Sequence, residues 1–261
     1  MESVEKGTSK INMKVATPVD VVSRYAKGWM NVEYDQTLEL TWINLKDINI
    51  CETLVVADGS GSMTMPVSGN TRALDVANAL AIYTSEHNNE IYKDKYITFS
   101  ATPQFVDLSK ANSLKEKLQI AFKHNEVANT NIEAVFDLIL DIACDNDIQK
   151  DEMIKNILII SDMEFDYAQI SYYDEGNELT KALFNKIKNR YNRAGYDLPK
   201  LIFWNVNSRT KTIPLIENEL GVTLISGFSQ NVLKMVMSNK YDSYEVLIET
   251  LDSERYAPIK I

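Results

Sequence analysis

Short apolar runs alternate with longer amphipathic segments along most of the chain, and this alternation constrains the fold more than any other feature. Residues 54–57 and 157–160 are continuous apolar runs, as expected of strands that are covered on both faces. Residues 71–88 carry apolar side chains at helical spacing. Strands that alternate with helices are joined by right-handed crossovers. The sequence therefore predicts an α/β fold, a doubly wound and mostly parallel open sheet that is flanked by helices.

The same pattern places the remaining elements. Strands are expected at residues 54–57, 96–99, 104–106, 156–160, 201–204 and 222–225. Helices are expected at residues 19–25, 71–88, 113–123, 130–142 and 179–191, with two closing helices between 230 and 255. The first fifty residues are less regular, although Thr17 followed by Pro18 is typical of a helix start. We therefore expect an N-terminal extension over residues 1–50, an arm and a short helix, that packs on a main domain over residues 51–261.

The composition argues against several classes of protein. A formal net charge of -10 opposes a surface that binds nucleic acid through many phosphate contacts, which requires clustered Lys and Arg. Cys51 and Cys144 are the only cysteines, so neither a disulfide framework nor a CxxC pair is expected. No apolar stretch approaches the length of a membrane span, and the first residues lack the apolar region of a signal peptide. We expect a cytoplasmic protein that binds no membrane.

Side chains with oxygen atoms follow the predicted strands at the points where they end. Asp58, Ser60 and Ser62 come directly after the first buried strand, Thr130 stands at a helix start, and Asp162 follows the strand at 156–160. In open α/β sheets, ligands collect outside the carboxyl ends of the strands. Carboxylates and hydroxyls are hard oxygen ligands of the kind that Mg²⁺ prefers. The sequence therefore predicts a divalent-cation site at this edge of the sheet.

The order and spacing of these residues resemble the metal-ion-dependent adhesion site of the von Willebrand factor type A (vWA) family, whose signature is Asp-x-Ser-x-Ser, a distant Thr and a distant Asp. Residues 58–63 match the first element, and Thr130 and Asp162 match the other two. The resemblance covers roughly residues 51–226. It is strongest to the intracellular branch that includes the C-terminal half of the Ro autoantigen and related uncharacterised bacterial and viral proteins, whose strand end reads like residues 160–165.

The resemblance implies a Rossmann-like vWA fold with Mg²⁺, or Mn²⁺ or Ca²⁺, held by Asp58, Ser60, Ser62, Thr130 and Asp162. In that family, a partner's Asp or Glu carboxylate completes the coordination of the metal. The predicted function is therefore a metal-dependent protein-binding module, with a protein partner that presents such a carboxylate. Direct binding of nucleic acid is not expected.

Each residue of the predicted site also has an ordinary interpretation. Thr130 with Glu133 matches a helix capping box, and an Asp after a strand is common in turns. Glu164 and Asp166 stand beside Asp162 and are candidates for outer-shell contacts to the metal. The hypothesis of a joint site rests on the occurrence of all these residues in the order of the family.

Two other functions compete with protein binding. A metal-dependent phosphohydrolase or nuclease would use Asp58, Asp162 and Glu164 around the ion. Against it, no second acid lies two residues from Asp58, and the phosphate-binding and dinucleotide-binding glycine loops are both missing. No catalytic residue is therefore assigned, and an enzyme is not expected. The resemblance to the Ro branch implies the other alternative, a scaffold part of a ribonucleoprotein.

Overall fold

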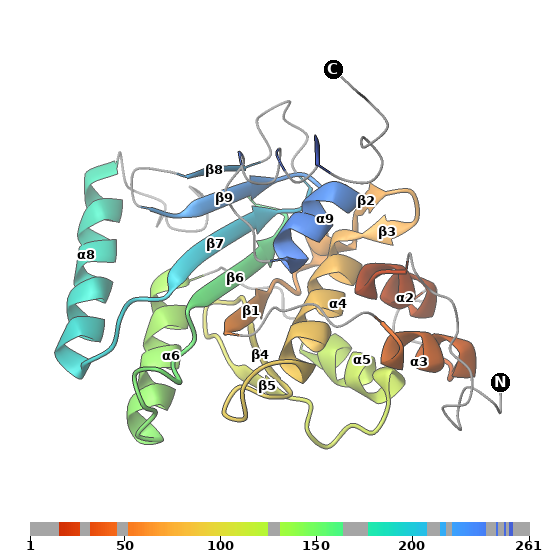
Figure 1. The fold of residues 1–261 in the computed structure, drawn as a ribbon, viewed down its shortest axis with the longest axis horizontal. Helices are drawn as coiled ribbons and strands as arrows, with labels where there is room; N and C mark the ends of the chain where they lie inside the picture. Colours follow the sequence, from red (N-terminus) through yellow and green to blue (C-terminus); the bar gives the residue numbers. More distant parts are fainter. Residues whose placement is uncertain are drawn as a thin grey trace.

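A sheet of mostly parallel strands forms the centre of the computed structural model (Figure 1). The structure describes residues 16–26, 32–45, 52–124, 131–163, 177–207, 215–217 and 221–238, with residues 244, 248, 251 and 252 singly. Within these residues, the sheet has seven strands in the order β5-β4-β1-β6-β7-β9-β8. They are β1 (Thr53–Ala57), β4 (Lys95–Thr98), β5 (Phe105–Asp107), β6 (Asn156–Ser161), β7 (Lys200–Asn205), β8 (Leu215–Glu217) and β9 (Thr223–Ser226).

The five inner strands are parallel, and each edge of the sheet carries one antiparallel strand, β5 or β8. The main helices are α2 (Pro18–Tyr25), α3 (Gln36–Ile43), α4 (Ala73–Glu86), α5 (Leu114–Lys123), α6 (Ile132–Asp145), α8 (Asn177–Ala194) and α9 (Gln230–Met237). Among the described residues, none of the helices is both long enough and apolar enough to cross a membrane. The predicted α/β class and the mostly parallel open sheet are confirmed.

Alternate residues of the buried strands face two separate cores, one on each side of the sheet. Leu54 and Val56 of β1 pack with α6 and α8, whereas Val55 and Ala57 pack with α2, α4 and α9. Figure 1 shows α6 and α8 on one side of the strands and the other helices on the opposite side. The continuous apolar runs of the sequence follow from this double coverage.

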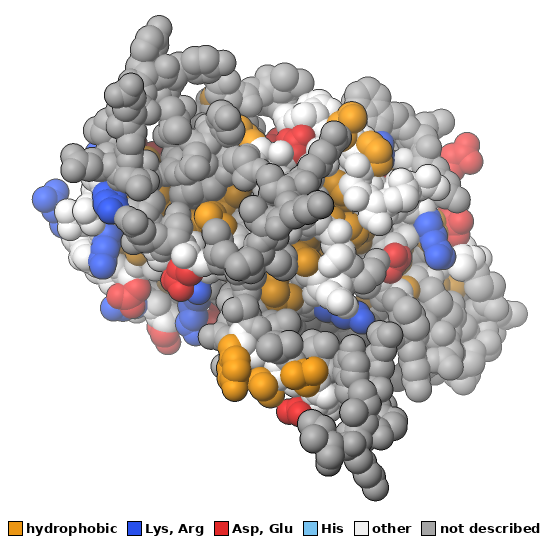
Figure 2. All heavy atoms as spheres, turned by 90° about the horizontal axis from the view of Figure 1, so that it is seen from above, with side chains coloured by type: hydrophobic (Ala, Val, Ile, Leu, Met, Phe, Trp, Pro, Cys, Tyr) orange, Lys and Arg blue, Asp and Glu red, His pale blue; other side chains and the backbone are white. Residues whose placement is uncertain are grey.

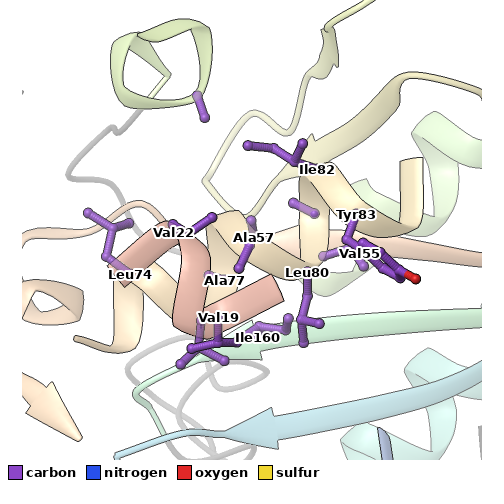
Figure 3. Packing of buried hydrophobic residues seen from close by; sticks show 14 of the residues in the cluster. Val19, Val22, Val55, Ala57, Leu74, Ala77, Leu80, Ile82, Tyr83 and Ile160 are labelled. Carbon is purple, nitrogen blue, oxygen red and sulfur yellow. The ribbon is translucent and has the colours of Figure 1, made fainter. Parts of the chain in front are cut away.

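Helix α4 lies in the middle of the larger core. Every residue from 73 to 85 is buried, because the sheet covers one side of the helix and α2 covers another. In Figure 3, Ala77 and Leu80 of α4 lie near Ala57 of β1, and Val19 and Val22 of α2 pack against the same helix. A helix that is apolar all round is expected only where it is buried on all sides.

The start of α2 follows the sequence prediction. Thr17 is the N-cap, and its hydroxyl accepts a hydrogen bond from the backbone N–H of Asp20 at 3.2 Å. The Asp20 carboxylate accepts one from the backbone N–H of Thr17 at 2.8 Å, which completes a capping box. Pro18 occupies the first turn, where its missing N–H costs no hydrogen bond.

The predicted capping box at the start of α6 is wrong. The N-cap is Asn131, whose side-chain oxygen accepts a hydrogen bond from the backbone N–H of Ala134 at 3.1 Å. Glu133 instead contacts Lys186 and Arg190 of α8, each at 2.8 Å. Asn is as good an N-cap as Thr, and the cations of the neighbouring helix hold the Glu133 side chain away from the cap. Thr130 lies outside the described residues.

Helix α3 was not predicted, since only one short helix was expected in the first fifty residues, and neither were two shorter features. A hairpin of β2 (Pro66–Ser68) and β3 (Thr71–Arg72) precedes α4, so the helix begins at Ala73 instead of residue 71. Strand β8 is added antiparallel to β9 at the sheet edge. Of the two closing helices, α9 is confirmed, and residues 244, 248 and 251 are also helical. No observation tests the division into residues 1–50 and 51–261, which stays a prediction.

A buried carboxylate joins the first two helices to α5. Glu39 of α3 is 7% exposed and accepts hydrogen bonds from the Tyr25 hydroxyl at 2.8 Å and from the backbone N–H groups of Leu114 at 2.9 Å and Lys115 at 3.0 Å. These N–H groups open α5, and a helix N-terminus favours a negative charge. Burial raises the pKa of Tyr25 well above its ordinary value, so this hydroxyl remains a donor at neutral pH.

We predict that Glu39→Ala lowers the free energy of unfolding by about 3 kcal/mol, because the change leaves two buried donors and one partly buried donor without their acceptor. Urea denaturation followed by circular dichroism measures this loss. Glu33→Ala, which removes an exposed carboxylate from the segment before α3, should change stability by about 0.5 kcal/mol or less. Equal urea midpoints for Glu39→Ala and the native chain would contradict the structural role of Glu39.

Candidate metal centre

The candidate site lies where β1 and β6 end side by side. These strands are parallel neighbours, and their register pairs Ala57 with Ile160. The backbone N–H of Asp58 continues the ladder by donating to the carbonyl of Ile160 at 3.0 Å. From β1 the chain crosses to β4 on one side and later returns to β6 on the other, so the strand order reverses here. Such a reversal point is where open α/β sheets bind ligands.

Asp58 is held in place by two hydrogen bonds. Asp58 is buried, with 2% of its surface exposed. One oxygen of its carboxylate accepts a hydrogen bond from the backbone N–H of Ser60 at 2.8 Å. The other oxygen accepts from the hydroxyl of Ser161, the last residue of β6, at 2.6 Å. One oxygen of Asp58 is therefore fixed from the loop after β1, and the other is fixed from the end of β6.

Burial raises the pKa of Asp58 above its ordinary value, and the nearby charge of Asp162 acts in the same direction. The hydrogen bonds from Ser161 and Ser60 oppose this shift. Among the described residues, no Lys or Arg forms an ion pair with either carboxylate. A buried carboxylate without a cationic partner is unfavourable, and a bound cation would compensate for its charge.

Two serine hydroxyls connect the loop after β1 to Asp162. The hydroxyl oxygens of Ser60 and Ser62 are 3.1 Å apart, and the Ser62 hydroxyl donates to a carboxylate oxygen of Asp162 at 3.0 Å. Ser62 lies in a short 3-10 helix, η1 (Gly61–Thr64), that is anchored by the fully buried side chain of Met63. Ser62 itself is exposed. The three side chains thus form a continuous row of oxygen atoms that reaches solvent.

The structure brings together four of the predicted ligands, Asp58, Ser60, Ser62 and Asp162. Thr130, Glu164 and Asp166 lie outside the described residues. Ser161 was not predicted as part of the site, yet its hydroxyl donates to Asp58 at 2.6 Å and accepts from the backbone N–H of Met163 at 3.2 Å. A hydroxyl next to Asp162 was visible in the sequence, but only the register of β1 with β6 directs it toward Asp58.

The donor set suits a hard divalent cation. It consists of two carboxylates and two hydroxyls, and Mg²⁺, Mn²⁺ and Ca²⁺ all prefer oxygen ligands of these types. In the part of the chain that the structure describes, three or more His, Cys, Asp or Glu side chains do not converge anywhere in a metal-binding group. The candidate site therefore depends on its serine hydroxyls as much as on its carboxylates.

We predict that Asp58→Asn melts at a higher temperature than the native chain at neutral pH in the presence of a chelator. Because the pKa of Asp58 is raised in the folded state, its contribution to stability is greatest below its ordinary pKa and is lost as the pH rises through the raised value. The neutral amide avoids the cost of a buried charge and keeps an acceptor for the N–H of Ser60. Thermal unfolding in EDTA measures the shift.

Asp162→Asn is the matched control, since this carboxylate is half-exposed and its neutralisation should shift the melting temperature less. A melting temperature of Asp58→Asn below that of the native chain would contradict the charge burial described above.

The chain was compared with known protein families, sequences and structures. Residues 52–257 match a sequence family described as a domain of unknown function (DUF7788). An uncharacterised protein of Acanthamoeba polyphaga mimivirus is 30% identical over 268 residues, which span the whole of this chain and 44% of that protein. The chain thus spans less than half the length of this relative.

Two solved structures are similar to this chain. One is the Ro (RSR) protein of Deinococcus radiodurans, with a TM-score of 0.49 and 16% identity over 86% of this chain and 45% of that one. The other is an aerotolerance-related membrane protein of Bacteroides fragilis, with a TM-score of 0.35 and 13% identity over 77% of this chain and 96% of that one. The sequence family, matched over most of the chain, settles its membership: the chain belongs to the DUF7788 family.

Proposed function

We propose that this chain is a metal-dependent protein-binding module, in which a divalent cation at the carboxyl ends of β1 and β6 receives a carboxylate from a protein partner. The row of oxygen atoms from Ser60 through Ser62 to Asp162 carries this proposal. It joins loops that are 100 residues apart in the sequence, and Asp58 lies buried directly behind it. An arrangement of hard oxygen donors that reaches solvent suits an ion that another molecule can contact.

The proposal gives each residue a role. Asp162 and the hydroxyls of Ser60 and Ser62 would hold the cation, and Asp58 would supply further negative charge. By the resemblance to the vWA family, Thr130 would complete the set, with Glu164 and Asp166 in outer contacts. When bound, a divalent cation supplies a positive centre that attracts an anionic ligand. Mg²⁺ is the first choice, with Mn²⁺ or Ca²⁺ as alternatives.

The burial and the hydrogen bonds of Asp58 favour a role in binding over a role in hydrolysis. A general base or a nucleophile needs an oxygen that can reach the reacting group. Both oxygens of Asp58 already accept hydrogen bonds from within the site, and the residue is 2% exposed. This geometry suits a residue that orients the loop and balances charge. The cytoplasmic location inferred from the sequence remains a prediction.

We predict that the native chain binds Mn²⁺ and Mg²⁺, and that Asp162→Ala weakens the affinity at least about tenfold, because the change removes a carboxylate from the set of donors. Isothermal titration calorimetry measures the affinity. Asp151→Ala is the matched control, since it removes an exposed carboxylate from the turn before the opposite end of β6. Equal heats for Asp162→Ala and the native chain, or no binding by the native chain, would rule out the proposed cation site.

Partner binding is tested separately. The immobilised native chain is expected to retain a protein partner from cell extract in Mg²⁺ and to release it in EDTA, whereas Asp162→Ala retains none and Asp151→Ala behaves as the native chain does. Captured proteins that are indifferent to EDTA would contradict metal-dependent recognition. Hydrolysis of a phosphoester such as p-nitrophenyl phosphate, lost in Asp162→Ala, would favour the enzyme instead.

A further inference from the structure

A hollow lies at the end of the sheet where the parallel strands begin, whereas the candidate metal centre lies at the end where they finish. It has a volume of about 660 Å³ and lies between α8 and the segments that lead into β7 and β9. This volume falls within the range of about 300–1,000 Å³ that is typical of ligand pockets. Its floor is apolar and consists of Phe184, Pro199, Leu201 and Val222, all of which are buried. Its rim is polar and exposed.

Helix α8 supplies most of the rim. Lys181, Asn185, Lys188 and Asn192 follow one another at spacings of four, three and four residues, which places them on one face of the helix. The Lys200 side chain adds a third cation from the start of β7. We name this hollow, with its apolar floor and these rim residues, the α8 groove.

The cations of α8 have two different environments. Lys186 and Arg190 face α6, where Glu133 and Asp137 pair with them at 2.6 to 2.8 Å. Within the described residues, Lys188 and Lys200 form no ion pair through their side chains. The charge of these two lysines is therefore not compensated by described acidic side chains.

The charge of the α8 groove contrasts with that of the whole chain. The net charge of the chain is -10, whereas the described residues that line the groove include three lysines and one acid, Asp197. Asp197 is itself paired with Lys150 at 3.0 Å. In Figure 2, Lys and Arg side chains lie together with Asp and Glu side chains at the end of the molecule that α8 occupies in Figure 1. A basic rim around an apolar floor in an acidic protein favours a ligand that is both anionic and apolar.

We propose that the α8 groove binds an acidic peptide segment of a protein partner, with an apolar side chain of the peptide seated on the floor. The lysines pair with the Asp or Glu side chains of the peptide, and the amides of Asn185 and Asn192 are placed to form hydrogen bonds with its backbone. Single-stranded RNA fits less well. Such RNA is bound mainly by the stacking of successive bases on several aromatic side chains, and among the described residues that line the groove only Phe184 is aromatic.

The α8 groove is independent of the cation site. Parallel strands place their carboxyl ends at one edge of the sheet and their amino ends at the other. The metal centre follows the ends of β1 and β6, whereas the groove precedes the starts of β7 and β9. Binding of an acidic peptide in the groove therefore requires no metal, and a chelator separates the two sites experimentally.

The test measures fluorescence anisotropy of a short fluorescein-labelled peptide that consists of Glu and Asp with one central Phe. All titrations contain EDTA, which removes the cation site as an alternative anchor. The native chain should bind the peptide, and the double variant Lys188→Glu with Lys200→Glu should bind it about tenfold or more weakly, because each reversal replaces attraction by repulsion. Replacement of the central Phe by Ser in the peptide should also weaken binding.

The matched control is the double variant Lys93→Glu with Lys234→Glu, which changes the net charge equally at exposed positions outside the groove. It should bind the peptide much as the native chain does, and circular dichroism checks that both variants fold. Equal weakening in the two double variants, or no binding by the native chain, would overturn the proposal. A labelled uridine oligonucleotide that binds the native chain more tightly than the peptide does would also overturn it.

Discussion

The parallel pairing of β1 with β6 is the contact on which the rest of the site depends. Five consecutive residues of β1 pair with five of β6, and the last pair joins Ala57 to Ile160. This register places Asp58 beside Ser161 and brings Ser62 within hydrogen-bond distance of Asp162. A shift by one residue would turn the alternating side chains of β6 to the opposite face. The buried Ile and Leu side chains on both faces of β6 therefore help to fix the geometry of the site.

The burial that fixes the register also removes the carboxylate of Asp58 from water, which disfavours its charged form. Asp58 stands at the end of a fully buried strand, so its carboxylate loses most of its contact with water. The hydrogen bonds from Ser161 and Ser60 stabilise the charged carboxylate in part, but the pKa of Asp58 is still raised. A carboxylate with a raised pKa is expected to weaken the folded state at neutral pH. Such a cost is more typical of a functional site than of a residue that serves packing alone.

The sequence predicted the inner strands and the long helices because their signals are local. Residues 54–57 and 157–160 are apolar without interruption, and the Thr17 cap is readable from its own neighbours. Elements that depend on distant contacts were missed. The short hairpin before α4 is one of them: Arg72 ends β3 and donates to Asp75 in the first turn of α4 and to the carbonyl of Ala26 after α2. The antiparallel edge strand β8 is another, since three residues carry little periodic signal.

The candidate site shows the same division. Asp58, Ser60, Ser62 and Asp162 could be predicted from the sequence, because each follows a buried strand directly or within a few residues. Loops in that position gather at the carboxyl ends of the parallel strands. Ser161 was not predicted, since its role depends on which neighbour it faces across the sheet. The cap of α6 was misplaced by one residue, because Thr and Asn are both good N-caps. The hydrogen bond from the N–H of Ala134 to the Asn131 side chain shows that Asn131 opens the helix, and Glu133 contacts α8 instead of the cap.

The shared direction of the parallel strands explains why the two proposed binding sites lie at opposite ends of the strands. Each helix that precedes a parallel strand starts near the carboxyl edge of the sheet and ends near the amino edge, so helix N-termini gather at the first edge and C-termini at the second. N-termini favour acidic side chains, and the carboxyl edge holds Asp58 and Asp162, which suit a cation. C-termini favour basic side chains, and the final turns of α8 carry Lys188 and Arg193 toward the amino edge. The fold thus separates the two carboxylates of the proposed cation site from the lysine rim of the proposed peptide site, and places them at opposite ends of the parallel strands.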